Sequence, residues 1–301
     1  MTCNDSSSNI DKGADRSVPT GTTPTLAHDG GRYFEGPRWH AGRLWFVDCL
    51  ARTLLSLGAT GDCQQHAAFA DDTPCGLGIL PDGNLIVLTM FRKRLLKYAD
   101  GQLSLHADLS RIAAGTIDDM IVDGLGRCYV GDLGFDLPPP ADRGAVGRII
   151  LVMPDGAARV VADGLRFPNG IAVSADHRRL VVAEMDGGCL ADFAIEADGG
   201  LSGCRRFGSV KDPDGICLDG EQAVWVASFT EDAFIRIDRE GRERQRIEVP
   251  GRRAIACVLG GPDRRTLFCL SAATSHEEMM QRKSSARIDV IDVQDCGAGY
   301  P

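Results

Sequence analysis

Four oxygen-bearing side chains stand at equivalent places in a repeating pattern of the sequence: Glu35, Asp118, Asn169 and Asp214. Each stands just before a short apolar run, which is followed by a polar turn and a second apolar run. Three carboxylates and one carboxamide offer only hard oxygen donors, which suit Ca²⁺ or, as alternatives, Mg²⁺ or Mn²⁺. Zn²⁺ is a less natural occupant, because it usually takes His or Cys ligands. We therefore predict one shared site for a divalent cation, with Ca²⁺ as the first choice.

Such a site could carry out hydrolysis. A bound cation can polarise an ester carbonyl and lower the pKa of a bound water. A neighbouring carboxylate can accept the proton of that water, and Asp118 and Asp214 are the two candidates for this catalytic base. The chain has neither the Gly-x-Ser-x-Gly motif of serine hydrolases nor a dinucleotide-binding fingerprint. The simpler alternative is that the four side chains only cap strands and close turns, as Asp and Asn before Gly often do.

Six units repeat along the chain at intervals of about 40 to 50 residues. The residues that mark them are Glu35, Gly76, Asp118, Asn169, Asp214 and approximately Ala256. Each unit contains short runs rich in Val, Ile and Leu, separated by Asp-Gly or Gly-Gly turns, which is typical of strands in hairpins. Units of this length with about four strands each predict an all-β, six-bladed β-propeller. Its innermost strands would bring the four side chains to a metal site on the central axis.

Two segments interrupt the regular pattern and are expected to be loops. Residues 134–147 lengthen the third unit and contain Pro138, Pro139 and Pro140, which cannot lie together inside a sheet. Residues 271–285 form the second segment. Insertions in repeat proteins often collect on a functional face, so either loop could cover the mouth of a central pocket.

Composition narrows the class of protein and its partners. Of the 301 residues, 44% are hydrophobic and 25% are charged, and the formal net charge is −9. This balance argues against a nucleic-acid-binding groove, and no apolar run is long enough to span a membrane. We expect a loosely attached or disordered leader at 1–24, a single propeller at 25–295 and a C-terminal tail at 296–301. The segment near 19–33 is expected to add a strand to the last blade.

The eleven cysteines are scattered, and no two of them form a Cys-x-x-Cys pair. An odd number at irregular spacing favours free, buried thiols over a disulfide framework. The cysteine pattern therefore predicts a reduced, cytoplasmic protein. We also expect a monomer or a weak homo-oligomer.

Three motifs resemble those of a known family: Phe-Glu-Gly-Pro-Arg-Trp at 34–39, Phe-Pro-Asn-Gly-Ile-Ala-Val at 167–173 and Pro-Asp-Gly-Ile at 213–216. They look like the gluconolactonase family, also called the senescence-marker or regucalcin-like family. The resemblance implies a six-bladed propeller with a catalytic divalent metal on its axis. Carried over by motif, Glu35, Asn169 and Asp214 would be metal ligands, and Asp214 would also be a candidate base.

One motif departs from the sugar lactonases of this family. They usually read Arg-x-Asn-Asp where this chain has Thr116-Ile117-Asp118-Asp119. The sequence here is more similar to the drug-responsive bacterial lactonases, in which the first Asp of the pair lies beside the calcium. By this resemblance Asp118 is also a metal ligand, and the absence of the Arg argues against an aldonolactone substrate. We place Thr116, Asp119 and Phe135 at the substrate.

These observations together predict a metal-dependent hydrolase that opens the ring of a lactone. One alternative uses the same site to hydrolyse a phosphotriester or a fluorophosphate. The other is a non-catalytic scaffold in which the metal only ties the blades together.

Overall fold

The computed structural model describes residues 23–141, 144–275, 277–278, 281 and 283–299. Most of the segment predicted as a leader therefore lies outside the described residues, as do His276, Met279 and Met280 of the second loop. The described chain is mostly β-structure, with one short 3₁₀ helix, η1 (Met185–Gly187), and two α-helical residues, Glu277 and Glu278. None of its helices is long and apolar enough to cross a membrane.

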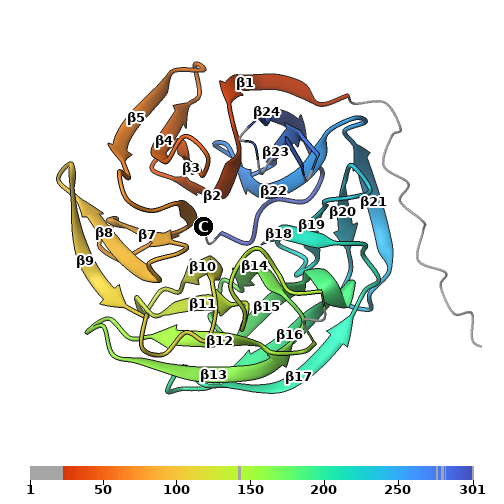
Figure 1. The fold of residues 1–301 in the computed structure, drawn as a ribbon. Coiled ribbons are helices and arrows are strands. Elements are labelled where there is room, and N and C mark those ends of the chain that lie inside the picture. The colour runs from red at the N-terminus through yellow and green to blue at the C-terminus, as the bar shows by residue number, and fades with distance from the viewer. Residues whose placement is uncertain (1–22, 142–143, 276, 279–280, 282, 300–301) are drawn as a thin grey trace, which may run out of the picture.

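The strands form six antiparallel four-stranded sheets arranged around a central axis, which confirms the predicted six-bladed β-propeller (Figure 1). The first blade contains β2 (Phe34–His40), β3 (Arg43–Asp48), β4 (Thr53–Gly58) and β5 (Cys63–Ala68). The second contains β6 (Pro74–Ile79), β7 (Leu85–Thr89), β8 (Arg94–Ala99) and β9 (Gln102–Asp108). The third contains β10 (Ile117–Val122), β11 (Cys128–Asp132), β12 (Gly147–Val152) and β13 (Ala158–Leu165).

The fourth and fifth blades follow the same order. The fourth contains β14 (Pro168–Val173), β15 (Arg179–Glu184), β16 (Cys189–Ile195) and β17 (Leu201–Phe207). The fifth contains β18 (Pro213–Leu218), β19 (Val224–Ser228), β20 (Ala233–Ile237) and β21 (Glu243–Glu248). The sixth blade contains β22 (Arg253–Gly260), β23 (Thr266–Ala273), β24 (Ser285–Asp292) and the N-terminal strand β1 (Thr25–Gly31).

Strand β1 closes the ring by pairing antiparallel with β24, with Thr25 opposite Val290. The outer strand of the last blade therefore comes from the start of the chain, as the sequence predicts. This arrangement covers the edge of β24, which would otherwise present unpaired backbone groups. It also ties together the two ends of the described chain.

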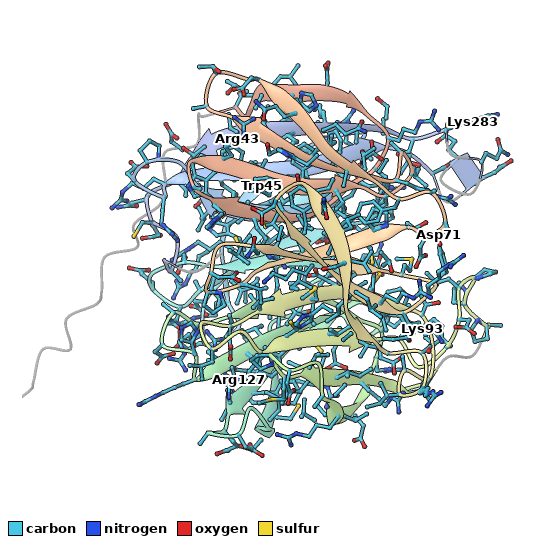
Figure 2. The ribbon with its side chains drawn as sticks, turned by 90° about the vertical axis from the view of Figure 1, so that its left-hand side faces the viewer. Arg43, Trp45, Asp71, Lys93, Arg127 and Lys283 are labelled. Carbon is cyan, nitrogen blue, oxygen red and sulfur yellow. The ribbon has the colours of Figure 1, made fainter. Side chains whose placement is uncertain are left out.

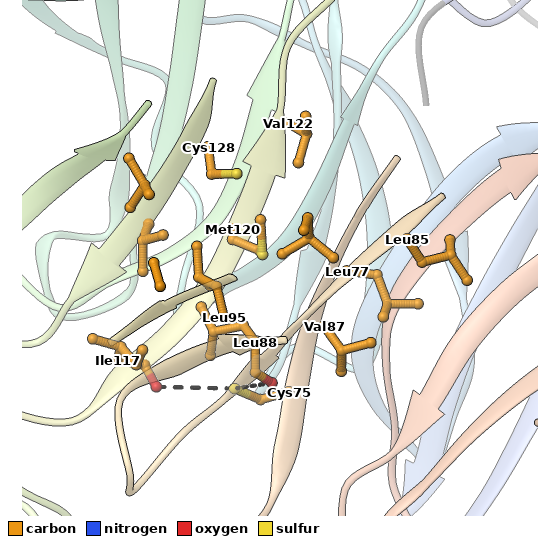
Figure 3. Packing of buried hydrophobic residues seen from close by; sticks show 14 of the residues in the cluster. Cys75, Leu77, Leu85, Val87, Leu88, Leu95, Ile117, Met120, Val122 and Cys128 are labelled. Atoms are coloured by element: carbon orange, nitrogen blue, oxygen red, sulfur yellow. Dashed lines mark hydrogen bonds between the residues drawn. The ribbon is translucent and has the colours of Figure 1, made fainter. Parts of the chain in front are cut away.

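The inner strands β2, β6, β10, β14, β18 and β22 each contact the next around the ring and line the central channel. Apolar side chains fill the space between blades. Between the second and third blades, for example, Leu77 and Leu88 pack in one buried cluster with Met120, Val122 and Cys128 (Figure 3). The ten cysteines that the structure describes are all free, in agreement with the sequence prediction.

We expected the four marked side chains to stand just before their strands. In the structure they are instead the second residues of β2, β10, β14 and β18. The reason is an irregularity in the pairing of each inner strand with its neighbour, for example between Glu35 and Arg38 and between Pro213 and Ile216. Each inner strand therefore joins its sheet earlier than a regular ladder would. Bulges of this kind reorient side chains and are common beside functional sites.

One end of the propeller holds the first residues of all six inner strands. Asp71, Lys93 and Lys283 lie on loops at this end, whereas Arg127 lies toward the other (Figure 2). The insertion of the third blade, between Asp132 and Gly147, is at the end with the four marked side chains, which we call the mouth. At the opposite end the C-terminal segment enters the ring, where the Ala298 amide donates to the Leu218 carbonyl (Figure 1).

Candidate metal centre

Glu35, Asp118, Asn169 and Asp214 come from four different blades and lie at the mouth of the channel. Asp214 is 3% exposed and Asn169 is 8% exposed, whereas Glu35 and Asp118 are half-buried. The carboxyl groups are close enough to perturb one another. Burial raises the pKa of Glu35 well above its usual range, and Asp214 and then Asp118 raise it further.

The same crowding acts on the two aspartates. Burial, followed by the charges of Asp118 and Asp119, raises the pKa of Asp214 well above its ordinary value, while a hydrogen bond from Asn169 acts in the opposite direction. Burial, and to a lesser extent Asp119, raises the pKa of Asp118 to about 7. Carboxylates placed together in this way repel one another unless a cation or protons neutralise them.

A second set of carboxylates recurs in three of the blades. Its members have hydrogen-bond or ionic partners within the protein, and they serve as a comparison for the first set. Asp48, Asp132 and Glu184 end the second strands of their blades. Asp48 accepts the Arg32 amide at 2.7 Å. Asp132 accepts the Gly115 amide at 3.0 Å and pairs with Arg148 at 2.5 Å.

Glu184 completes this second set. It accepts the Arg166 amide at 2.8 Å and pairs with Arg206 at 2.6 Å. Each of these three carboxylates holds the segment that leads into the inner strand of its own blade, β2, β10 or β14. In the part of the chain that the structure describes, by contrast, no Lys, Arg or His forms an ion pair with Glu35, Asp118 or Asp214.

The donor set of the inner strands fits a divalent cation in type and charge. Three carboxyl groups and one carboxamide oxygen are hard donors, and the carboxyl groups have no described basic partner. As they stand, the described residues bring no three His, Cys, Asp or Glu side chains close enough together to hold a metal ion. The fit therefore concerns the chemistry of the donors and not a finished coordination shell.

Arg38 is a buried cation that pairs with Asp119, next to Asp118 in the sequence. Its Nη2 atom lies 3.6 Å from Asp119 Oδ1 and donates to the Met120 carbonyl. Asp119 Oδ2 in turn accepts the Ile171 amide at 3.1 Å. Because Arg38, Asp119 and Ile171 belong to the first, third and fourth blades, this chain of contacts fixes three inner strands relative to one another.

Thr116, Asp119 and Phe135, which we predicted to contact substrate, lie in three different environments. Thr116 is 1% exposed, and its hydroxyl accepts the Leu137 amide at 3.1 Å. Asp119 is held by Arg38 and Ile171. Phe135 is half-buried in the insertion, with its ring 5.7 Å from that of Phe167.

Tyr33 is a residue near the site that sequence reasoning missed. Burial raises the pKa of its phenol well above the usual range, and Asp214, Glu35, Cys49 and Asp118 raise it further. The phenol therefore lies among the charges of three blades. The one available signal was its place directly before the Phe34-Glu35-Gly36 motif, at the entrance to the first inner strand. A thiol also lies nearby, because Cys75 Sγ donates to the Asp118 carbonyl at 3.0 Å.

A profile of the SMP-30/gluconolactonase/LRE-like region matches residues 34–273. The chain belongs to this family. The match confirms the resemblance seen in the motifs, and it spans nearly the whole propeller, from the first inner strand to the end of β23, the second strand of the sixth blade. It also agrees with the closed six-bladed architecture described above.

Named members of the family cover most of the chain. A pentonolactonase, XacC, from Haloferax volcanii is 28% identical over 254 residues, which are 80% of this chain and 82% of that protein. A 6-deoxy-6-sulfogluconolactonase from Pseudomonas putida is 27% identical over 279 residues, covering 89% and 93% of the two chains. The calcium-binding protein regucalcin from Agrobacterium tumefaciens has a similar structure, with a TM-score of 0.72 at 23% identity over 92% and 97% of the chains. That last likeness shows a shared fold.

Proposed function

We propose that this protein hydrolyses lactones with the help of a divalent cation, most simply Ca²⁺, held by Glu35, Asp118, Asn169 and Asp214. The observation that carries this proposal is the contrast between the two repeated carboxylate sets. The carboxylates at the ends of the second strands all accept backbone amides, and Asp132 and Glu184 also pair with arginines, whereas the set at the mouth has no described basic partner. The pentonolactonase and sulfogluconolactonase relatives support lactones as the substrate class.

The exposure of the side chains at the mouth suggests which of them bind the cation and which transfers protons. When bound, the cation would supply Lewis-acid chemistry, polarising the ester carbonyl and stabilising the oxyanion. Asp214 and Asn169 are buried and hydrogen-bonded to each other, which suits them to hold a ligand in a fixed geometry. Asp118 is half-buried at the mouth, which suits it to exchange protons with water.

In the proposed reaction Asp118 accepts a proton from water as the water oxygen bonds to the lactone carbonyl carbon. The ring C–O bond then breaks, and the proton passes from Asp118 to the departing alkoxide. The product is a hydroxy acid, and Asp118 returns to its ionised form. No covalent enzyme intermediate is needed, in keeping with the absence of a serine-hydrolase motif.

Acid release from a panel of lactones, followed in a calcium-containing buffer, tests this function. The panel contains unsubstituted, alkyl, aryl and sugar lactones of both ring sizes, together with a phosphotriester and a fluorophosphate. We expect ring opening of at least one lactone with kcat/KM well above the rates for both phosphorus esters. Hydrolysis of the phosphorus esters alone would replace the lactonase proposal. A chain that binds calcium and gains thermal stability but hydrolyses nothing would be a scaffold.

A further inference from the structure

Three apolar side chains from three separate segments lie near the candidate metal centre. Phe135 comes from the insertion of the third blade, Phe167 stands just before β14, and Met185 follows β15. The rings of Phe135 and Phe167 are 5.7 Å apart. The Met185 amide donates to the Phe167 carbonyl at 3.0 Å, and Met185 Sδ lies 3.8 Å from the Asn169 amide nitrogen. We call Phe135, Phe167 and Met185 the apolar wall.

The position of Phe135 in this wall is fixed from two sides. Its carbonyl accepts the Thr116 amide at 3.0 Å, and two residues later the Leu137 amide donates to the Thr116 hydroxyl at 3.1 Å. A Cβ at Gly115 would lie 2.1 Å from the Phe135 nitrogen, so only glycine lets the insertion pack this closely. The insertion is therefore anchored to the residues that lead into β10, beside Asp118.

Several polar groups near the wall already have partners, although Asp119 Oδ1 has no hydrogen bond and only faces Arg38 Nη2 at 3.6 Å. Thr116 and Asp119, the two polar residues that sequence reasoning placed at the substrate, accept backbone amides of Leu137 and Ile171. Lys93 Nζ lies 3.5 Å from Asp136, and Arg206 is paired with Glu184. A substrate that carries many hydroxyl groups would need polar side chains whose hydrogen-bonding groups are available to it.

We infer that the substrate is a lactone with an apolar alkyl or aryl substituent, which packs against Phe135, Phe167 and Met185, and not a polyhydroxylated sugar lactone. The inference rests on the proposed function, because the wall is defined by its place beside the candidate ligand Asn169. It names a substrate class different from the sugar lactones in the names of the relatives. Burial of the substituent against half-buried aromatic and thioether groups would supply the binding energy.

Two series of lactones matched in ring size test the inference with the full-length protein in calcium. The five-membered series compares γ-butyrolactone, γ-nonalactone, γ-phenyl-γ-butyrolactone and galactonolactone, and the six-membered series compares δ-valerolactone, δ-decalactone and gluconolactone. We expect alkyl or aryl members to exceed the sugar member of the same series by at least about tenfold in kcat/KM. Sugar lactones turned over as well or better would overturn the inference and leave the proposed function standing. Hydrolysis of no lactone would overturn both.

Variants of the wall provide an independent readout. Phe135→Ala and Met185→Ala should each lower kcat/KM for the substituted lactones by about 10- to 100-fold, mainly through KM, while the unsubstituted ring changes by less than about threefold. Met185→Leu keeps the volume and apolarity and should retain most of the activity. Leu125→Ala is the control, because Leu125 is 61% exposed in a turn at the opposite end of the propeller. Equal losses of kcat/KM on substituted and unsubstituted rings would contradict a role of the wall in recognising the substituent. If a variant fails to fold, the two lactone series measured with the wild-type protein still test the inference.

Discussion

Asp132 and Asp214 illustrate two uses of a buried carboxyl group. Asp132 ends the second strand of its blade, and Asp214 lies near the start of the inner strand of another blade. Asp132 accepts three backbone amides and pairs with Arg148, so its charge is neutralised within the protein. Asp214 receives a hydrogen bond from Asn169 but lies beside two other acidic groups that raise its pKa. A recurring carboxylate is therefore informative about function only when its hydrogen-bonding and ionic partners are known.

The two aspartates proposed as base and ligand should respond differently to removal of their charge. Asp118→Asn keeps one oxygen at the site and should retain the cation while losing about two to four orders of magnitude in rate, the usual scale for a lost general base. Asp214→Asn should weaken cation affinity first, so that excess Ca²⁺ restores part of its activity. Lactone hydrolysis measured against calcium concentration separates the two. Rescue of Asp118→Asn and not of Asp214→Asn would reverse the assignment.

A suitable control for these variants is Asp82→Asn. Asp82 is half-exposed at the opposite end and pairs with Lys97 at 2.9 Å, so its loss should leave cation binding and rate unchanged. Asp123 is a poor control, although its Asp-Gly sequence resembles the turn that contains Asp82. It is fully buried and pairs with Arg127 at 2.6 Å, so removing its charge would disturb the fold.

At the scale of the strands, the candidate centre depends on how closely the inner strands approach. A Cβ at Gly170 would lie 2.4 Å from the Asp214 carbonyl, and one at Gly215 would lie 2.5 Å from Ala256 Cβ. The chain also enters β14 and β18 through strained residues. Phe167 and Asp212 adopt positive φ angles of 55° and 43°, which are rare for residues other than glycine. Strain of this kind costs about 1–3 kcal/mol per residue and clusters at functional sites.

Gly170→Ala should force β14 and β18 apart. We expect a loss of about 1–3 kcal/mol in the free energy of unfolding, the usual cost of overpacking, together with weaker Ca²⁺ binding because Asn169 and Asp214 no longer meet. Urea unfolding and calorimetric titration with calcium measure the two effects. Gly42→Ala is the comparison, since its Cβ would touch nothing within 4 Å and only its positive φ is penalised. Unchanged calcium affinity in Gly170→Ala would show that the close approach of these strands is unimportant for the site.

The contact between Arg38 and Asp119 is expected to matter more for the assembly of the blades than for substrate binding. Arg38→Met leaves the largely buried Asp119 carboxyl without its cation and should reduce the free energy of unfolding by about 3–5 kcal/mol. Arg246→Met removes a surface pair with Glu243 and should cost less than about 1 kcal/mol. Denaturant unfolding of both variants in excess calcium makes the comparison. A loss as small for Arg38 as for Arg246 would exclude the bridging role.

The inner strands could be predicted from the sequence, but the contacts between side chains of different blades could not. Turn residues and apolar runs recur with each blade, so the positions of Glu35, Asp118, Asn169 and Asp214 could be aligned by spacing alone. The bulges that place them inside their strands depend on pairing with the next strand, which local patterns do not specify. The roles of Tyr33, Arg38 and Asp119 depend on side chains from other blades, and closure of the ring alone brings these together.

At the scale of the whole molecule, the ring is held closed by β1 on β24. A chain that begins at Arg32 lacks β1 and exposes the edge of β24. We expect its Tm to fall by roughly 5–10 °C, as the loss of a few kcal/mol would produce in a domain of this size. A chain that begins at Thr23 keeps β1 and should have the Tm of the full-length protein, because the sequence predicts a loosely attached leader before it. Scanning calorimetry of the three chains checks both expectations, and equal Tm values for all three would contradict closure by β1.

The dependence of lactone hydrolysis on a divalent cation tests the central claim most directly. The protein is freed of metal with excess chelator, metal analysis verifies removal, and the rate of ring opening is measured as Ca²⁺ is added back. Four oxygen donors on four blades predict loss of turnover without metal, recovery that saturates with calcium, and a Tm that rises over the same concentration range because the unfolded chain has no preformed site. Full turnover by protein shown to contain no metal would contradict the account.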